Sequence, residues 1–396
     1  MDRMPVYVVD GARTPFGSFG GSLKDITATR LGAIAAAEAL RRSGVGPDAI
    51  DNVVFGNVIQ SHNGAPYLAR HIALDVGVPV ETPALTVNRL CGSGLQAVVT
   101  AAKDILLGES HIALAGGAES MSQAPYVLRG ARFGQRMGDA VAADVLTEAL
   151  TDCRGNLPMG ITAENLAERF GITREAQDEF ACLSQARAAA ARASGRLAEE
   201  IVPVSVPGRK GDTLVEQDEH IRPGTTLEAL ARLKPAFKAG GTVTAGNASG
   251  INDGAAAVVV ASGQAVAERG LKPVARILGW AVAGVEPAYM GIGPVPAVRK
   301  ALAAAGVSFE DVALWEVNEA FAAQYLSVER ELGLPRERTN VNGGAIALGH
   351  PIGASGARVL LTLAYELRRR GERIGVASLC IGGGQGIAMV IESTAD

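Results

Sequence analysis

The chain repeats its own plan of elements at long range, and this repeat limits the folds that it can adopt. Residues 31–55 read as a helix rich in Ala and Leu, a turn at Gly44-Val45, a short acidic helix and a strand. Residues 296–317 follow the same plan, and Gly306-Val307 lies 262 positions beyond Gly44-Val45. The two segments therefore predict the same supersecondary unit twice in one chain.

A second pair of motifs shares this offset. Ser93-Gly94 and Ser355-Gly356 are also 262 positions apart. Chance can produce one such match in a chain rich in Ala and Gly, but a common offset across two motifs argues for duplicated halves. Each half alternates strand and helix, which predicts a mixed sheet covered by helices on both sides. If the halves pack face to face about a pseudo-twofold axis, the turns that open their helices converge on one pocket.

Residues 122–251 interrupt the pattern between the halves. They contain loop-like Pro and Gly, a charged run at 209–212, and a helical stretch from about 173 to 193 whose apolar residues lie near one face. We interpret them as a domain inserted into the first half, whose last strand and helix, about 252–269, follow it. The predicted division is residues 1–121 with 252–272 as the N-terminal half, 122–251 as the inserted domain, and 273–396 as the C-terminal half.

Cys91 lies where a predicted strand gives way to a predicted helix. Residues 82–87 are apolar and β-branched, whereas apolar residues recur at helical spacing from Leu95 onward. Free N–H groups and the positive dipole end at a helix start favour a thiolate, and glycines let a substrate carbonyl approach the backbone. The alternative is a buried apolar cysteine, which is what most free cysteines are.

Two further reactive side chains lie in glycine-rich segments of the C-terminal third. His350 lies within residues 342–356, and Cys380 opens residues 380–386. Histidine titrates near neutrality and can take the proton of a cysteine nucleophile, while a second thiol can act as acid or base in another step. A lone histidine more often has a structural role, but the paired glycine-rich surroundings favour the reactive interpretation.

Charge and cysteine usage exclude several classes of function. A formal net charge of −4 gives no reason to expect nucleic acid or an anionic membrane as a partner. The cysteines show no C-x-x-C spacing and the histidines no H-E-x-x-H, so we expect no metal site. We find no signal peptide and no uninterrupted apolar stretch near 18 residues, and free thiols fit a reducing cytoplasm.

The sequence resembles the thiolase family over nearly its whole length. Seven segments carry the resemblance in the family's order: 88–95, 116–122, 159–165, 241–252, 318–322, 342–356 and 380–386. The resemblance implies an α/β protein of the thiolase fold. In that fold two duplicated βαβαβαββ halves form a five-layered αβαβα arrangement with an inserted loop domain.

The resemblance also implies roles for individual residues. Cys91 would be the acylated nucleophile, His350 would activate it, and Cys380 would handle the proton on the substrate carbon. Asn318 would position a water in one oxyanion hole. The backbone N–H groups of Cys91 and Gly382 would form the other hole.

The inserted domain of the family receives coenzyme A. By resemblance, Ser249 lies beside the pantetheine arm, Arg222 near the adenine, and Met159 and Phe321 in the acyl pocket. Taken without the resemblance, Ser249 could cap a following helix, Arg222 would be a solvated surface residue, and Met159 and Phe321 would be core residues. Asn318 could equally be a turn residue.

The implied activity is a reversible Claisen condensation of acyl-CoA with acetyl-CoA to 3-ketoacyl-CoA, together with its thiolytic reverse. It would run by a ping-pong mechanism through acyl-Cys91, with coenzyme A as substrate or product and no other cofactor. Many acetyl-specific biosynthetic thiolases have a histidine where this chain has Pro158. Because proline offers neither an imidazole nor an N–H, we expect acceptance of acetoacetyl-CoA and of longer 3-ketoacyl-CoA.

Assembly and the alternative functions complete the expectations. The glycine-punctuated segment 129–144 resembles the family's tetramer-forming loop, so we expect a homotetramer built as a dimer of dimers. One alternative is a non-catalytic acyl-CoA or lipid-binding protein of the same fold. Another is a redox sensor in which Cys91 and Cys380 form a reversible disulfide, which is compatible with turnover.

Overall fold

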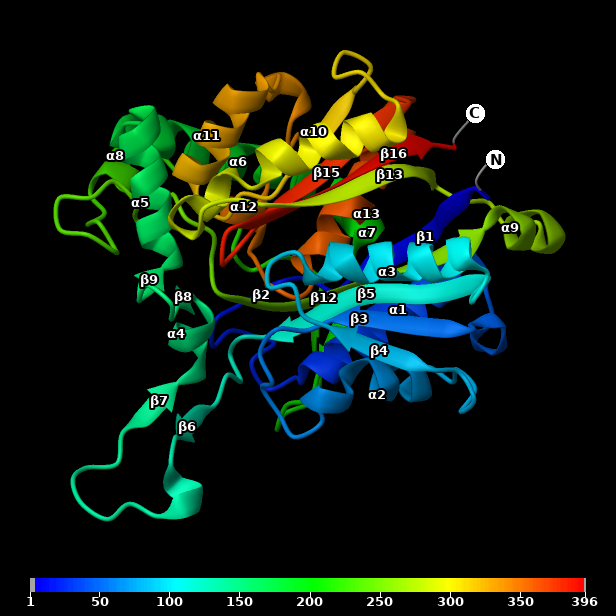
Figure 1. The fold of residues 1–396 in the computed structure, drawn as a ribbon, viewed down its shortest axis with the longest axis horizontal. Coiled ribbons are helices and arrows are strands. Elements are labelled where there is room, and N and C mark those ends of the chain that lie inside the picture. Colours follow the sequence, from blue (N-terminus) through cyan, green and yellow to red (C-terminus); the bar gives the residue numbers. More distant parts are fainter. Residues whose placement is uncertain (1–3, 395–396) are drawn as a thin grey trace.

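Two β-sheets, one from each half, form the frame of the molecule (Figure 1). The computed structural model describes residues 4–394. In spatial order the first sheet contains β4 (Ala84–Val87), β3 (Asn52–Gly56), β5 (Ile112–Ser120), β12 (Asn252–Ser262) and β1 (Val6–Arg13). The second contains β13 (Ala275–Gly284), β16 (Gln385–Ser393), β15 (Ile374–Ile381) and β14 (Leu314–Val317). β3 pairs in parallel with β4 and β5, whereas β12 pairs antiparallel with β5 and β1, so the sheet is mixed.

A short ladder joins the two sheets edge to edge. Residues Val6, Tyr7 and Val8 of β1 pair antiparallel with Ile277, Arg276 and Ala275 of β13. The strand β2 (Gly17–Ser18) adds a short pairing to β12. Strand order is therefore continuous from β14 to β4, although the two halves face each other across a layer of helices.

Helices fill three layers around the sheets in the order αβαβα (Figure 1). The middle layer holds α3 (Ser93–Leu107) and α13 (Ser355–Arg370), which pack on each other. One outer layer holds α1 (Ala28–Ser43) and α2 (Leu68–Asp75), and the other holds α10 (Pro294–Ala305) and α11 (Ala322–Leu332). The predicted five-layered thiolase arrangement is confirmed.

The duplication is visible at the level of single residues. α3 begins at Ser93 and α13 at Ser355, which keeps the offset of the sequence repeat. α1 ends at Gly44 with φ 67°, and α10 ends at Gly306 with φ 66°. This left-handed conformation closes a helix and costs glycine little because glycine has no Cβ. Equivalent helices therefore start and stop at equivalent positions in the two halves.

One apolar segment of the chain, interrupted by Lys103 and Asp104, forms a central helix. The segment Leu90–Leu107 is long and apolar enough, by length and composition, to cross a membrane. In the fold most of it is α3, whose Leu95, Val98 and Ala102 are buried between the first sheet and α13. A helix with neighbours on two sides needs a wide apolar surface, and this explains its composition.

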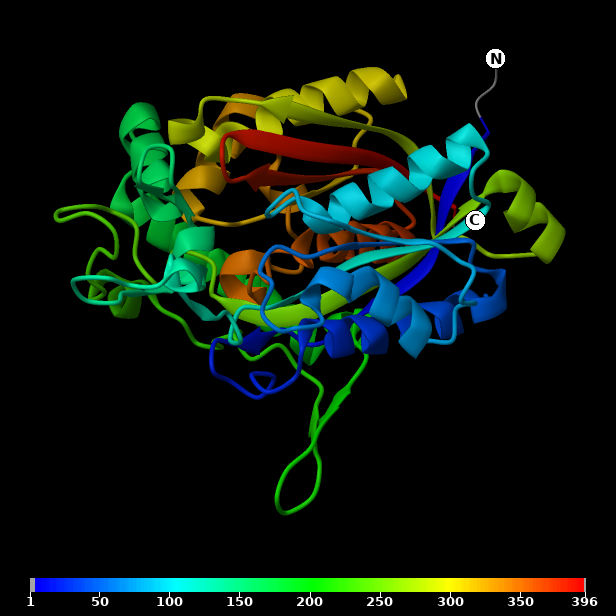
Figure 2. The same ribbon diagram turned by 60° about the horizontal axis from the view of Figure 1, so that its bottom comes forward.

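The inserted segment contributes one long helix and several shorter elements around the layers. It contains α5 (Met159–Phe170), α6 (Arg174–Ala193), α7 (Arg196–Glu200), α8 (Leu227–Ala231), α4 (Val145–Ala149) and the pair β8 (Thr151–Asp152) and β9 (Leu157–Pro158). The hairpin β6 (Tyr126–Leu128) and β7 (Ala142–Asp144) projects from the body in Figure 1, and the hairpin β10 (Val204–Val206) and β11 (Thr213–Val215) projects in Figure 2. After the insertion the chain returns through β12 and α9 (Gly263–Arg269), as the sequence predicts.

A buried ion network fastens the inserted segment to the first sheet. Arg13 on β1 donates from Nε to Glu200 at 2.6 Å and from its two terminal nitrogens to Asp218 at 2.7 and 2.9 Å. All three side chains are buried, and Asp218 also accepts the N–H of Phe16 at 2.8 Å. Loss of one partner would leave an uncompensated buried charge, which typically costs about 3–5 kcal/mol.

Candidate active site

The turn that carries Cys91 is held in a strained conformation. Leu90 has φ 46°, which is unfavourable for a bulky side chain. Asn88 accepts the N–H of Leu90 through its side chain at 2.9 Å. Ser93 donates its hydroxyl to the carbonyl of Leu90 at 2.6 Å and accepts the N–H of Arg89 at 2.8 Å. These bonds offset the strain and hold Cys91, which is half-buried, at the edge of a cavity.

The starts of α3 and α13 meet at glycine. A Cβ placed on Gly94 would lie 2.7 Å from the backbone nitrogen of Ala357, and one on Gly356 would lie even closer to the backbone of Leu95. The two glycines follow the two serines of the repeat. They let the turns of Cys91 and His350 approach backbone to backbone, so the predicted convergence of the two halves is confirmed.

His350 is buried in the loop between α12 (Ala345–Leu348) and α13. Its backbone N–H donates to the side-chain oxygen of Asn252 at 2.9 Å, and its Nδ1 lies 2.6 Å from the hydroxyl of Ser355. Its Nε2 lies 3.4 Å from Nδ2 of Asn318. Burial, aided by the nearby Arg358 cation, lowers the pKa of His350 to about 3. The imidazole is therefore neutral at neutral pH and has one unprotonated ring nitrogen.

The two cysteines of the site carry their protons in the free protein. Burial raises the pKa of the Cys91 thiol to about 11, although the N–H groups of Gly382 and of Cys91 itself act in the opposite direction. Burial and the neighbouring Cys91 raise the pKa of the Cys380 thiol. The backbone N–H groups at this helix start lower the pKa of Cys91, as expected, but desolvation outweighs them in the free protein. Cys91 therefore needs a base.

Asn318 follows β14 and is fully buried. A terminal nitrogen of Arg358 donates to Oδ1 of Asn318 at 3.4 Å, and the other terminal nitrogen donates to Glu316 at 3.3 Å. Arginine offers only donors, so this contact turns the amide oxygen of Asn318 toward Arg358 and its NH₂ group toward His350. Asn318 is thus an oriented donor in the site, not a turn residue on the surface.

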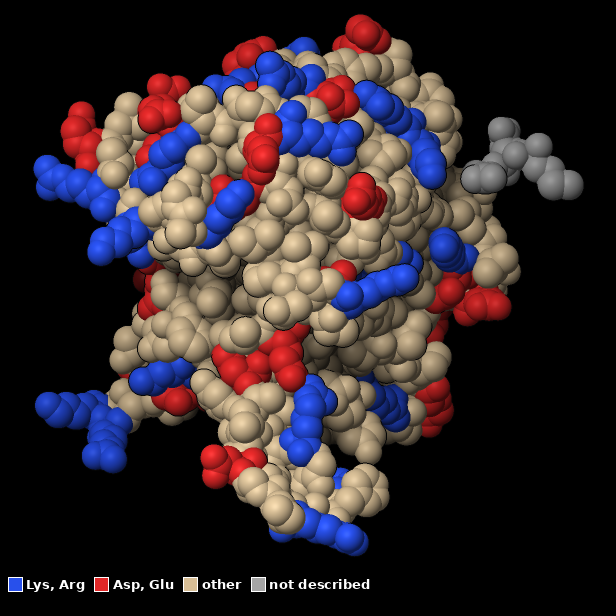
Figure 3. All heavy atoms as spheres, turned by 60° about the vertical axis from the view of Figure 1, so that its left-hand side comes forward, with Lys and Arg blue, Asp and Glu red and all other residues tan. Residues whose placement is uncertain are grey.

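One cavity of about 510 Å³ collects the other predicted residues. Cys91 and His350 lie in its wall together with Met159, Phe321, Ser249 and Arg222, and its further apolar lining includes Phe19, Met121, Leu150, Phe237, Met290 and Ile352. Ser249 is followed by strand β12, which excludes the helix-cap alternative. Arg222 is exposed, as a residue at the mouth of a cavity would be. Figure 3 shows that positive and negative side chains are interspersed on the side of the molecule where the inserted segment lies.

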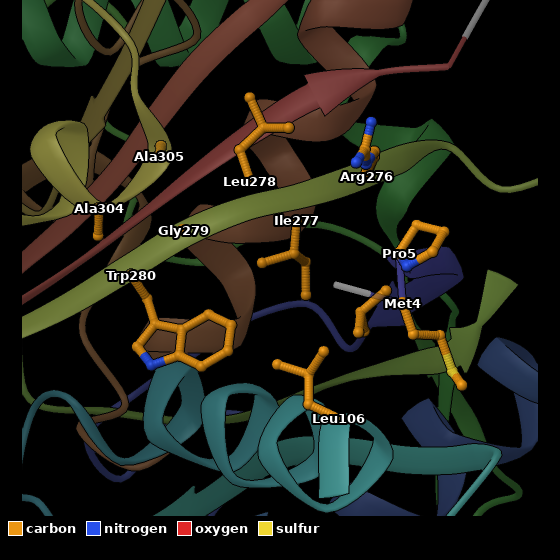
Figure 4. Close-up of a pocket in the computed structure, with 11 residues that line it drawn as sticks. Met4, Pro5, Leu106, Arg276, Ile277, Leu278, Gly279, Trp280, Ala304 and Ala305 are labelled. Atoms are coloured by element: carbon orange, nitrogen blue, oxygen red, sulfur yellow. The ribbon is translucent and has the colours of Figure 1, made fainter. Parts of the chain in front are cut away.

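A second cavity does not have the chemistry of an active site. It has a volume of about 320 Å³ and lies between β13 and the end of α3, where Trp280 and Leu106 face it (Figure 4). Its lining contains one charged side chain, Arg276, and none of the predicted site residues. Within residues 4–394 no group of three His, Cys, Asp or Glu is arranged to hold a metal ion.

Sequence reasoning missed three polar residues around the site: Glu119, Ser355 and Arg358. Glu119 accepts the N–H groups of Val58, Ile59 and Gly353 at 3.1, 3.0 and 2.9 Å, so it ties the loop after β3 to the loop after His350. Burial raises the pKa of Glu119 to about 8, although these N–H groups oppose the shift. A signal was present for Ser355, because it is the repeat partner of Ser93.

Comparisons with known proteins agree with this geometry. The sequence models of the families described as "Thiolase, N-terminal domain" and "Thiolase, C-terminal domain" match residues 6–264 and 271–393. The mitochondrial 3-ketoacyl-CoA thiolase of Homo sapiens is 55% identical over 391 residues, which cover 98% of each chain. The acetyl-CoA acetyltransferase of Syntrophomonas wolfei is 51% identical, with 98% of this chain and 99% of that one covered.

A solved structure extends the likeness to three dimensions. The crystal structure of human mitochondrial 3-ketoacyl-CoA thiolase in complex with CoA has a TM-score of 0.96 and 54% identity, and the match covers 99% of this chain and 98% of that one. The duplicated halves, the convergent Cys91 and His350, and these similarities over the full length lead to one conclusion. The chain belongs to the thiolase family.

Proposed function

We propose that this acyltransferase catalyses the reversible Claisen condensation of acyl-CoA with acetyl-CoA to 3-ketoacyl-CoA, and its thiolytic reverse, through acyl-Cys91. The observation that carries the proposal is that Cys91, from the first half, and His350, from the second, line one cavity, with the buried Cys380 of the second half close to Cys91. The relatives are named as enzymes that act on such thioesters, which favours catalysis over non-catalytic acyl-CoA or lipid binding.

The first half-reaction transfers the acyl group to the enzyme. The Cys91 thiol gives its proton to the neutral His350, and the resulting thiolate attacks the thioester carbonyl. The C–S bond to coenzyme A then breaks, and coenzyme A leaves as a thiol after taking up a proton. One thioester replaces another of nearly equal energy, so the step needs no energy-rich cofactor. The N–H groups of Cys91 and Gly382, which already act on the Cys91 sulfur, are the proposed oxyanion hole.

The second half-reaction forms the carbon–carbon bond. Cys380, which gives its proton to the departing coenzyme A in the first half-reaction, removes as a thiolate a proton from the α-carbon of acetyl-CoA. The enolate carbon then attacks the acyl-Cys91 carbonyl, and the released Cys91 sulfur takes back the proton held by His350. A thiol whose pKa is raised gives a strongly basic thiolate, which suits a weak carbon acid. His350 and a water held by Asn318 are the proposed donors to the enolate oxygen. Removal of one such donor commonly costs about 3 kcal/mol.

The inserted segment is proposed to receive coenzyme A. The CoA complex of the human relative supports this ligand class. Ser249 would lie beside the pantetheine arm and Arg222 near the adenine, with Met159 and Phe321 at the acyl group. The proposed division keeps residues 1–121 with 252–272, 122–251 and 273–396 as the N-terminal half, the inserted domain and the C-terminal half.

Pro158 supports a broad acyl range. It caps the start of α5 with φ −58° and offers neither an N–H nor a polar side chain next to Met159. The neighbouring lining from Leu150, Met290 and Phe321 is apolar. We therefore propose that longer 3-ketoacyl-CoA substrates are accepted beside acetoacetyl-CoA. Thiolysis rates with acetoacetyl-CoA and 3-ketohexanoyl-CoA test this, and a strong preference for the four-carbon substrate would refute it.

A homotetramer in a reducing cytoplasm is proposed as the working form. The β6–β7 hairpin exposes Phe133 and Met137 at 90% and 91%, which favours contact with another copy. The edge strand β4 leaves backbone groups open to pairing and exposes Leu85. Free thiols at the site fit a reducing compartment. No cofactor besides coenzyme A as substrate is proposed, and no metal.

The decisive experiment is thiolysis of acetoacetyl-CoA by the wild type and by Cys91→Ala. Loss of the 3-ketoacyl enolate absorbance on addition of coenzyme A reports turnover. Cys153→Ala is the matched control, because Cys153 is exposed in a loop away from the cavity lining. We expect activity in the wild type and the control and none in Cys91→Ala. An inactive wild type with this substrate and with longer ones would favour the non-catalytic alternative.

A further inference from the structure

We propose that Ser355 is a positioning residue that keeps the proton of His350 on Nδ1, so that Nε2 is the unprotonated nitrogen that takes the proton of Cys91. The inference rests on the proposed function, in which His350 is the base for Cys91. It assigns a role to the serine of the second repeat motif, which lies at the start of α13 and is fully buried.

The direction of a chain of hydrogen bonds carries the argument. Arg358 donates to Oδ1 of Asn318, so the NH₂ group of Asn318 faces Nε2 of His350, 3.4 Å away. An amide NH₂ can only donate, and Nε2 must therefore be the acceptor nitrogen. The single ring proton of the neutral imidazole is then on Nδ1.

Ser355 completes the chain at the other side of the ring. Nδ1–H of His350 points at the hydroxyl oxygen of Ser355, which lies at 2.6 Å. The hydroxyl hydrogen is then free for the carbonyl of Pro351, at 2.9 Å, which can only accept. In this arrangement each hydrogen bond, from Arg358 through Asn318, His350 and Ser355 to Pro351, has one donor and one acceptor. The reverse tautomer would set two donors against each other between Asn318 and His350.

The repeat shows that this serine does more than start a helix. Ser93, its partner in the first half, accepts the backbone N–H of Arg89 and donates to the carbonyl of Leu90. Ser355 likewise accepts one N–H and donates to one carbonyl of the preceding turn. In the second half, however, the accepted N–H belongs to the imidazole of the proposed base. Ser93→Ala therefore serves as a matched variant that disturbs a turn without touching His350.

The first measurement is the tautomer itself, in the intact protein with ¹⁵N-labelled histidine. The chain has five histidines, and the His350 signals are identified by their absence in His350→Ala. We expect a protonated Nδ1 and an unprotonated Nε2 in the wild type and in Ser93→Ala, and loss of this pattern in Ser355→Ala. A wild-type ring protonated at Nε2, or a wild-type pattern in Ser355→Ala, would overturn the proposal. The wild-type result decides even if a variant does not fold.

The second measurement is steady-state thiolysis with the same variants. Because the proposed base would spend less time with Nε2 free, we expect Ser355→Ala to lower kcat about tenfold to a hundredfold. KM for coenzyme A should stay within about twofold, and the alkylation rate of Cys91 by iodoacetamide should fall with kcat. Ser355→Thr keeps the hydroxyl and should restore both rates. Rates in Ser355→Ala equal to those of the wild type would refute the inference.

The outcomes separate this inference from the proposed function. Turnover that survives in Cys91→Ala and His350→Ala would refute the proposed function itself. Turnover that is lost in those variants but unchanged in Ser355→Ala would refute only the proposed role of Ser355.

Discussion

Gly94→Ala tests whether the close approach of the two helix starts is needed for catalysis. A Cβ at this position would lie 2.7 Å from the nitrogen of Ala357 and 3.0 Å from the carbonyl oxygen of Gly353. Ordinary contact begins near 3.4 Å, so the backbone after His350 must move by about 0.7 Å. Backbone atoms cannot rotate away as a flexible side chain can.

The magnitude follows from two opposing terms. Alanine is a better helix former than glycine by roughly 1 kcal/mol, whereas overpacking typically costs about 1–3 kcal/mol. We expect a net loss of stability of about 1 kcal/mol. A displacement near 1 Å can cost about 100-fold in rate. Because the contact pushes the Cys91 and His350 turns apart, kcat should fall about tenfold or more.

The assay is thiolysis of acetoacetyl-CoA together with thermal unfolding. Gly155→Ala is the control, because a Cβ there meets no atom closer than 3.9 Å. The control should match the wild type in both measurements. If Gly94→Ala keeps kcat within twofold of the wild type and does not lower the unfolding midpoint, the backbone contact does not position the site.

Four further predictions concern pH, anchoring, specificity and assembly. The folded protein lowers the pKa of His350 to about 3, so below about pH 6.5 the unfolded chain binds more protons than the folded one. The free energy of unfolding, measured in urea, should therefore fall as pH drops from about 6.5 toward 3. If His350→Asn leaves this pH dependence unchanged, the prediction is contradicted. Arg13→Met should lower the free energy of unfolding by about 3–5 kcal/mol, whereas Arg209→Met at the exposed hairpin tip should change it little. Pro158→His should raise the rate of thiolysis of acetoacetyl-CoA relative to that of 3-ketohexanoyl-CoA. An unchanged ratio of the two rates would show that this position does not set the range of acyl chain lengths. Phe133→Ser should convert the proposed tetramer into smaller species in light scattering, and an unchanged mass would exclude a role for this side chain in assembly.

The repeat and the reactive turns could be predicted because their signals are local. Gly44 and Gly306 mark helix ends through backbone geometry alone, and Cys91 stands between a strand pattern and a helix pattern. The rise of the Cys91 pKa above its ordinary value could not be predicted, because desolvation depends on the groups that cover the sulfur from other parts of the chain. The helix-start argument considered the local N–H groups and left out this larger effect.

The polar partners of Arg358 could not be predicted either, because they come from distant parts of the sequence. Arg358 lies on α13 and reaches Glu316 and Asn318 on and after β14, and no spacing rule links these positions. For Leu90–Leu107 the composition could be read from the sequence, but the surroundings of the helix could not. Its apolar pattern was visible, but its meaning depends on α13 and on the first sheet, which cover it from two sides.

The middle layer has a consequence for how the protein is made. α3 is synthesised before α13, which covers one of its faces and begins 262 positions later in the chain. During translation an apolar helix and its reactive cysteine are present before the matching helix and His350 exist. A chain that stops before residue 355 would leave α3 uncovered and prone to aggregate. The proposed nucleophile would thus meet its base only after the chain up to His350 has left the ribosome.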